Sequence, residues 1–100
     1  MVDKWDPKTG IVASIKSINL RCITYQEPAK LRSLIKRYID KVAEFRGEKS
    51  RYVTIRFDEI NHRELDLALP DFGTHIQERI LNEIVDYGVH LNVKVNLIPI

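Results

Sequence analysis

Apolar and polar residues alternate twice between positions 52 and 70, around a polar break at Asn61 and His62. The large apolar residues of the two runs occupy every second position, at Val53, Ile55 and Phe57 and again at Leu65, Leu67 and Leu69. A period of two is typical of β-strands that bury one face. The stretch therefore predicts a strand, a turn and a second strand.

Two other segments repeat apolar residues at helical spacing. The first begins near Glu27 and Pro28, because proline suits the first turn of a helix, and continues to residue 46 before Gly47. Its apolar positions are Leu31, Leu34, Ile35, Tyr38, Ile39, Val42 and Phe45. The second helix is expected after Thr74, which forms a capping box with Gln77, and is expected to end at Gly88.

The two ends of the chain add further strands. The turn sequence DPKTG at positions 6–10 predicts a hairpin between residues 2–5 and a strand that begins at Ile11. Residues 11–25 are expected to form one long strand with a bulge near Lys16 and Ser17, since the apolar positions change parity there. Residues 89–97 alternate cleanly and predict the last strand, with His90 on its outer face.

The predicted order is β-α-β-β-α-β, which is the split βαβ plan of ferredoxin-like folds. In this α+β fold an antiparallel-type sheet in the order 4-1-3-2 carries two helices on one face. We expect residues 1–100 to form a single domain of this kind, with residues 1–10 as an extra N-terminal β-hairpin. Such folds host unrelated functions, so function has to be argued from a site.

Composition places the chain among ordinary globular proteins, with 44% apolar and 30% charged residues. The net charge is only +2, but residues 1–50 hold eleven basic and six acidic residues and residues 51–100 hold five and eight. Cys22, expected on the inner face of the first strand, is the one cysteine and cannot form an internal disulfide. With charges in its first ten residues and no apolar run near the ~20 residues of a membrane span, the chain is expected to be cytoplasmic and away from membranes.

The second predicted strand of the 52–70 stretch places His62, Glu64 and Asp66 on one face. An imidazole and two carboxylates could ligate a divalent metal or act as acid and base. Polar alternation is also the pattern of a strand face that meets water. No glycine-rich phosphate-binding motif accompanies these residues, and no cofactor is expected.

The first helix offers a candidate nucleic-acid surface. Its basic residues flank the two edges of the apolar arc, at Lys30, Arg37 and Lys41 on one side and at Arg32 and Lys36 on the other. Such residues could contact phosphates. Asp40 and Glu44 lie between them, so a solvated face of mixed charge is the alternative interpretation.

Three short pieces resemble parts of the C-terminal domain of bacterial translation initiation factor three. They are KLRSLI at 30–35, VTIRF at 53–57 and HREL at 62–65, about fifteen residues in all. The first helix is longer here, and a predicted hairpin lies where that family passes directly into its second helix. The resemblance implies binding to RNA and carries no residue assignments.

Apolar residues at both chain ends support the leading hypothesis, a non-enzymatic interaction domain that acts as a homo-oligomer, most simply a dimer. The expected interface residues are Val2, Trp5, Ile11, Val12, Leu97, Ile98 and Ile100. Exposed apolar patches usually meet a partner. The alternatives are that both ends pack on their own domain, that the first helix binds RNA, or that His62, Glu64 and Asp66 serve a metal-dependent enzyme.

Overall fold

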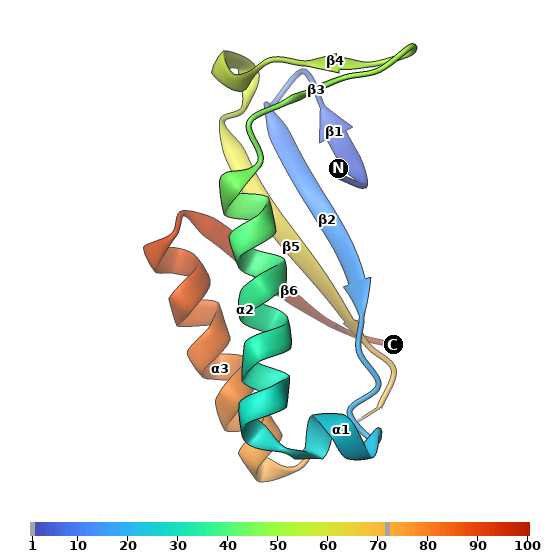
Figure 1. The fold of residues 1–100 in the computed structure, drawn as a ribbon, viewed down its shortest axis with the longest axis vertical. Helices are drawn as coiled ribbons and strands as arrows, with labels where there is room; N and C mark the ends of the chain where they lie inside the picture. The colour runs from blue at the N-terminus through green and yellow to red at the C-terminus, as the bar shows by residue number, and fades with distance from the viewer. Residues whose placement is uncertain (1, 72) are drawn as a thin grey trace.

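The computed structural model describes residues 2–71 and 73–100. Its elements, in chain order, are β1 (Lys4–Asp6), β2 (Ile11–Ser17), α1 (Ile23–Gln26), α2 (Pro28–Glu44), β3 (Glu48–Lys49), β4 (Thr54–Ile55), the 3₁₀ turn η1 (Phe57–Glu59), β5 (His62–Leu69), α3 (His75–His90) and β6 (Val93–Pro99) (Figure 1). No helix within these residues combines the length and the apolar character needed to cross a bilayer.

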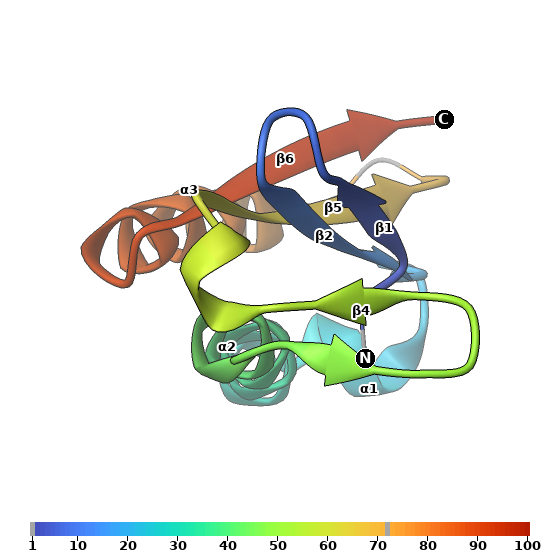
Figure 2. The ribbon, with the colours of Figure 1, turned by 90° about the horizontal axis from the view of Figure 1, so that it is seen from above.

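The main sheet is mixed and has the strand order β1-β2-β5-β6. β2, β5 and β6 run parallel, and β1 pairs antiparallel with the outer edge of β2. α2 connects β2 to β5 and α3 connects β5 to β6, so the two crossovers move in the same direction across the sheet. Crossovers of one hand then place both helices on the same face. Figure 2 shows them together on one side of the sheet, which leaves the other face open.

The core lies between this helix layer and the sheet. The fully buried side chains include Leu31, Ile35 and Ile39 from α2, Ile84 from α3, and Leu65 and Leu67 from β5. The crossover connections between parallel strands place helices against the faces of the sheet, and here both helices cover the same face. The molecule is therefore a small α+β domain with one apolar layer.

Several predicted elements are confirmed. Residues 4–6 and 11–13 pair across the DPKTG turn as expected. α2 begins at Pro28 and ends at Glu44, close to the predicted range. The capping box of α3 is present in both directions, because Thr74 accepts from the Gln77 backbone and Gln77 accepts from the Thr74 backbone. These features depend on residues close together in the sequence.

The predicted ferredoxin-like strand order and the antiparallel-type sheet are wrong for this molecule. Residues 53–57 contribute only the two-residue strand β4, which pairs with β3 in a separate two-stranded sheet. β5 instead starts beside the beginning of β2, where the backbone amides of Asn61 and His62 both donate to the Gly10 carbonyl oxygen. That contact sets β5 parallel to β2, with Ile11 opposite His62.

The predicted strand over residues 11–25 ends early. β2 stops at Ser17, and Ile18 and Leu20 are buried in the irregular segment that follows. The short helix α1 then occupies residues 23–26, so Cys22 lies at its N-terminus and is exposed rather than on an inner strand face. No bulge is needed, because the change of apolar parity marks the end of the strand.

The last strand begins four residues later than predicted. α3 continues through Gly88 to His90, so His90 ends a helix and does not lie on a strand face. Gly88 serves close packing there, because a Cβ at this position would lie 2.7 Å from the carbonyl oxygen of Val93. Asn92 turns the chain with φ of 59°, a conformation that asparagine tolerates, and β6 starts at Val93.

Candidate active site

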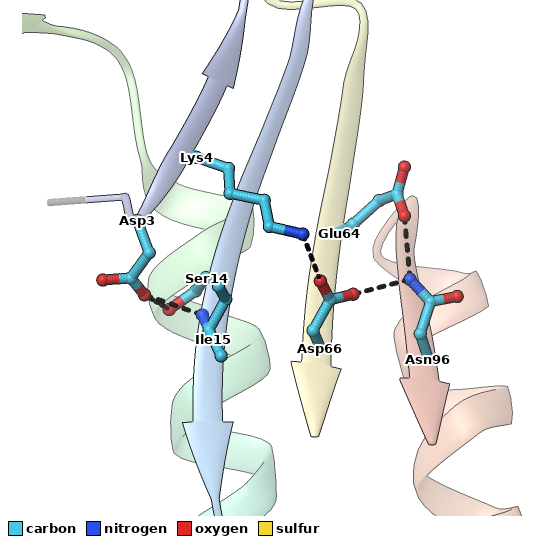
Figure 3. A network of polar contacts seen from close by, with 7 residues as sticks. All are labelled: Asp3, Lys4, Ser14, Ile15, Glu64, Asp66 and Asn96. Atoms are coloured by element: carbon cyan, nitrogen blue, oxygen red, sulfur yellow. Dashed lines mark hydrogen bonds and ion pairs between the residues drawn. The ribbon is translucent and has the colours of Figure 1, made fainter. Parts of the chain in front are cut away.

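The β1–β2 hairpin places an acidic side chain against the edge of β2. The backbone amide of Asp3 donates to the Ala13 carbonyl oxygen over 2.9 Å and extends the ladder by one bond. Beyond that point Asp3 Oδ2 accepts from the Ile15 backbone amide at 2.7 Å and from the Ser14 hydroxyl at 3.4 Å (Figure 3). The carboxylate thus replaces the backbone acceptor that a longer β1 would have supplied.

Lys16 lies on the same face of β2 as Ser14, since the two residues are two positions apart on one strand. Its ammonium group sits 5.3 Å from the centroid of the Tyr38 ring on α2. A pocket of about 410 Å³ opens between β2 and the C-terminal half of α2. It is lined by Val2, Ser14, Lys16, Tyr38, Lys41, Val42, Glu44 and Phe45.

The charges of this pocket favour an anionic ligand. Lys16 and Lys41 both line it, whereas Glu44 is the only acidic side chain of its lining. Asp3 approaches from the side of Ser14 and uses only Oδ2 in its hydrogen bonds and ion pairs with the described residues. The arrangement offers two cations, a hydroxyl and one carboxylate oxygen to a bound phosphate and a water molecule.

A second polar cluster lies on the open face of the sheet and connects three strands. The side-chain amide of Asn96 on β6 donates to Glu64 Oε1 and to Asp66 Oδ1 on β5, each at 2.8 Å. The Lys4 ammonium on β1 donates to Asp66 Oδ2 at 3.3 Å (Figure 3). Lys4 neutralises the Asp66 carboxylate, and each of its two oxygens accepts a hydrogen bond. The Asp66 residue is buried. The cluster is therefore built to hold the strands together.

The predicted grouping of His62, Glu64 and Asp66 does not assemble into a metal site in the structure. His62 is exposed at the first residue of β5. Across residues 2–71 and 73–100, no three or more His, Cys, Asp or Glu side chains come together as they would to hold a metal ion. Glu64 and Asp66 do share a face, as the alternation predicted.

The five basic residues of α2 have different contacts in the structure. Arg32 binds Glu83 of α3 at 3.0 Å, and the Lys36 ammonium lies 5.0 Å from the Tyr87 ring centroid, so both serve helix packing. Lys30 pairs with Glu27 at 3.4 Å within its own helix. Arg37 shares a shallow hollow with Lys30. Lys41 alone among the five lines the pocket beside Lys16.

The apolar residues near the two chain ends also differ in how buried they are. Val12 has no exposed surface, because it faces α2 from β2 and belongs to the core. Four of the expected interface residues are half-buried, namely Val2, Trp5, Ile11 and Leu97. Ile98 and Ile100 are exposed. The seven residues therefore do not form one exposed apolar patch.

Sequence reasoning missed Asp3, Ser14 and Lys16. It took Ile11, Ala13 and Ile15 as the core-facing set of the first strand, but Ile15 is on the open face and 45% exposed. The helix-facing positions are Val12, Ser14 and Lys16. The available signal was that the polar residues Ser14 and Lys16 alternate with apolar residues in the strand, across a tight turn from an acidic residue.

Two deoxyribonucleases are similar to this chain over almost its full length. Deoxyribonuclease CdiA of Yersinia pseudotuberculosis serotype O:3 (strain YPIII) is 32% identical over 96 residues, which cover 95% of this chain and 9% of that protein. Deoxyribonuclease CdiA-o11 of Escherichia coli O157:H7 (strain EC869) is 30% identical over 96 residues, which cover 95% of this chain and 26% of that protein. The chain thus spans a small part of each relative.

A solved structure has the same fold. It is the CdiA-CT/CdiI toxin and immunity complex from Yersinia pseudotuberculosis, with a TM-score of 0.86 and 31% sequence identity. The match covers 99% of this chain and 81% of that chain. The mixed sheet with both helices on one face is therefore shared with a toxin domain.

These comparisons correct the functional predictions. The hypothesis of a non-enzymatic homo-oligomer is wrong, because the similar proteins are named deoxyribonucleases. The prediction of self-association is wrong as well, since the similar structure is a complex of a toxin with an immunity protein. Binding to RNA, which the short pieces similar to initiation factor three implied, is not supported.

The family assignment rests on nearly the whole chain. A family model described as the CDI toxin restriction endonuclease-like domain matches residues 1–98. The two deoxyribonucleases and the toxin structure agree with that match in length and in fold. The chain therefore belongs to the family of CDI toxin restriction endonuclease-like domains.

Proposed function

We propose that this chain is a nuclease domain that hydrolyses phosphodiester bonds of DNA in the pocket beside Asp3, Ser14 and Lys16. The observation that carries the proposal is the contact of Asp3 with the backbone amide of Ile15 and with Ser14, a residue that also lines the pocket of Lys16 and Lys41. The names of the related deoxyribonucleases support DNA as the substrate. The open-face cluster is the weaker candidate, because its carboxylates are already paired.

Hydrolysis requires a water molecule that attacks phosphorus and groups that stabilise the charge gathering on the phosphate oxygens. The water forms the new P–O bond and releases a proton to solvent, the bond to the leaving oxygen breaks, and that oxygen takes up a proton from solvent. Lys16 donates to a non-bridging phosphate oxygen and stabilises the added charge. Asp3, held by Ser14 and the Ile15 amide, directs its Oδ1 at the attacking water and orients it.

The residues fit a divalent cation that is shared with the substrate. Mg²⁺ is usually bound through one or two carboxylates together with substrate phosphates, and Asp3 supplies one such carboxylate. They do not fit a cage made by the protein alone, since no cluster of three or more ligating side chains occurs in the described part of the chain. When bound, such a cation lowers the pKa of a coordinated water and neutralises phosphate charge.

Cleavage of supercoiled plasmid DNA in the presence of Mg²⁺, Mn²⁺ or Zn²⁺ tests the proposal. We expect Asp3→Asn and Lys16→Ala each to lower the cleavage rate by about 100-fold or more, because each removes a group that acts on the reacting phosphate or water. Glu64→Gln is the matched control on the open face and should cleave at nearly the wild-type rate. Loss of cleavage in Glu64→Gln with full activity in Asp3→Asn would show that the site has been assigned to the wrong face.

A further inference from the structure

A short hairpin, residues 46–56, leaves the catalytic pocket at the end of α2. Lys41 and Phe45 in and after the last turns of α2 line the pocket, and the hairpin starts at the next residue, Arg46. Figure 1 shows β3 and β4 at the end of the molecule where α2 ends, and Figure 2 shows them on the side of the sheet where α2 lies. The hairpin therefore borders the space into which a phosphate backbone would enter.

The base of this hairpin is held firmly. Ile55 is buried at 4% exposure, and Gly47 has φ of 127° with its missing Cβ position only 2.4 Å from the Ile55 carbonyl oxygen. No other residue fits such a position without moving the paired strand. The Arg63 guanidinium of β5 donates to the carbonyl oxygens of Val42 and Phe45 and so fixes the end of α2 from which the hairpin departs.

The tip is ordered as well, although the ladder is short. The Ser50 backbone amide and hydroxyl both donate to the Val53 carbonyl oxygen, at 2.8 and 3.0 Å, and the Val53 amide donates to the Ser50 hydroxyl at 3.1 Å. This closes a turn that presents Arg51 and Tyr52 to solvent. Tyr52 is 85% exposed, and the Arg51 guanidinium lies 5.6 Å from the centroid of the Tyr52 ring.

The hairpin is strongly basic. Residues 46–56 contain four basic residues and one acidic residue, which gives a net charge of +3 in eleven residues. Arg46, Lys49 and Arg51 form no ion pair with any residue that the structure describes, whereas Arg56 pairs with Asp58 at 3.3 Å. The acidic Glu48 is opposite the buried Ile55 and is half-buried, so the exposed side carries Lys49. Unpaired cations beside an exposed aromatic ring suit a polyanion.

We propose that residues 46–56 form a DNA-contacting ribbon that binds the sugar-phosphate backbone of the duplex to one side of the cleaved bond. This inference rests on the proposed nuclease function. A two-stranded ribbon has the right width for the major groove of B-DNA. The path from Phe45 to Arg51 spans about 20 Å at roughly 3.3 Å per residue. The ribbon therefore reaches about six base pairs from the pocket, at ~3.4 Å per pair.

Salt-dependent binding to a duplex of about 24 base pairs tests the ribbon apart from catalysis, using Asp3→Asn as the background that does not cleave. We expect the double variant Lys49→Gln and Arg51→Gln to flatten the slope of log affinity against log salt by about two, since each phosphate contact contributes about 0.9. Arg21→Gln with Arg79→Gln removes the same charge at the far end of the molecule, from the loop before α1 and from α3. This control should change the slope by well under one.

Steady-state cleavage by the active chain gives the second readout. Because the ribbon is remote from the reacting phosphate, the Lys49→Gln and Arg51→Gln pair should raise KM about tenfold or more and leave kcat within about twofold. Equal slope changes in the ribbon and control variants would overturn the ribbon proposal and leave general charge attraction as the cause. Unchanged DNA affinity in the ribbon variant would also overturn it and assign the hairpin to a protein partner. Neither outcome affects the proposed nuclease function, which stands or falls with cleavage by the wild-type chain.

Discussion

Tyr87 and Asp40 form a contact between α3 and α2 whose strength depends on a proton. The Tyr87 hydroxyl donates to Asp40 Oδ1 at 2.6 Å. This hydrogen bond, partial burial and the negative charges of Asp40 and Glu44 together raise the pKa of Tyr87 above its usual value. The carboxylate favours the protonated phenol as its donor and repels the phenolate, so the contact is lost when Tyr87 ionises.

This contact predicts how stability changes at high pH. The folded-state pKa of Tyr87 is raised above the unfolded value of about 10, so its contribution is fully present below that pH and is lost as the pH rises through the folded pKa. Urea unfolding should therefore show wild type more stable than Tyr87→Phe at neutral pH, with a difference that shrinks above pH ~10. Tyr52→Phe is the control. Because Tyr52 is exposed, this substitution should change the stability of the folded state little. A difference independent of pH would contradict the role given to the proton.

The strand β5 combines two kinds of stabilisation, one on each face. Leu65 and Leu67 point into the core with no exposed surface, and Asp66 points to the open face, where it receives Lys4 and Asn96. The first face removes apolar area from water. The second face ties β1, β5 and β6 together through charge-assisted hydrogen bonds.

Substitutions on β5 should therefore cost stability on both faces. Leu67→Ala is expected to lose about 2–5 kcal/mol, because it leaves a cavity in a packed core. Asp66→Ala is expected to lose about 1–3 kcal/mol, because Asn96 is left half-buried with one of its two acceptors removed. Lys94→Ala, an exposed position on β6, should change stability by less than ~0.5 kcal/mol. Chemical denaturation measures the free energy of unfolding of all three variants. An Asp66→Ala protein as stable as wild type would show that the open-face cluster does not stabilise the fold.

At the scale of the whole molecule, charge is distributed unevenly between the two halves of the sequence. The excess of basic residues in the first half of the chain includes Lys16 and Lys41, which line the pocket. The excess of acidic residues in the second half includes Glu64 and Asp66 on the open face. A negative ligand is therefore attracted to the pocket side of the domain.

The burial of the apolar residues at the two chain ends predicts that the protein is a monomer. Val12 is in the core and the exposed Ile98 and Ile100 are too few to form a stable interface between copies, which needs about 800 Å² from each partner. Light scattering over a dilution series should give the mass of one chain at every concentration. A concentration-dependent dimer of the chain alone would contradict this expectation.

The sequence by itself determined the features that depend on near neighbours. α2 follows from its apolar spacing and Pro28, the start of α3 from Thr74 and Gln77, and the β1–β2 hairpin from the turn DPKTG. Each of these is stabilised by hydrogen bonds and contacts within a few residues. The alternation on β5 was also read correctly, since Leu65 and Leu67 are buried and Glu64 is not.

Only the tertiary structure decided which strands pair and where the candidate site lies. A period of two shows that a strand has a buried face but does not name its neighbour, and here β5 pairs with β2 because the Gly10 carbonyl receives the start of β5. That pairing, with α2 packed above it, turned Ser14 and Lys16 toward the pocket and Ile15 to the open face. Asp3 reaches Ser14 across eleven residues of chain, and Lys41 joins Lys16 from another element. Contacts at such separations depend on the packing of whole elements, which no local pattern of residues specifies.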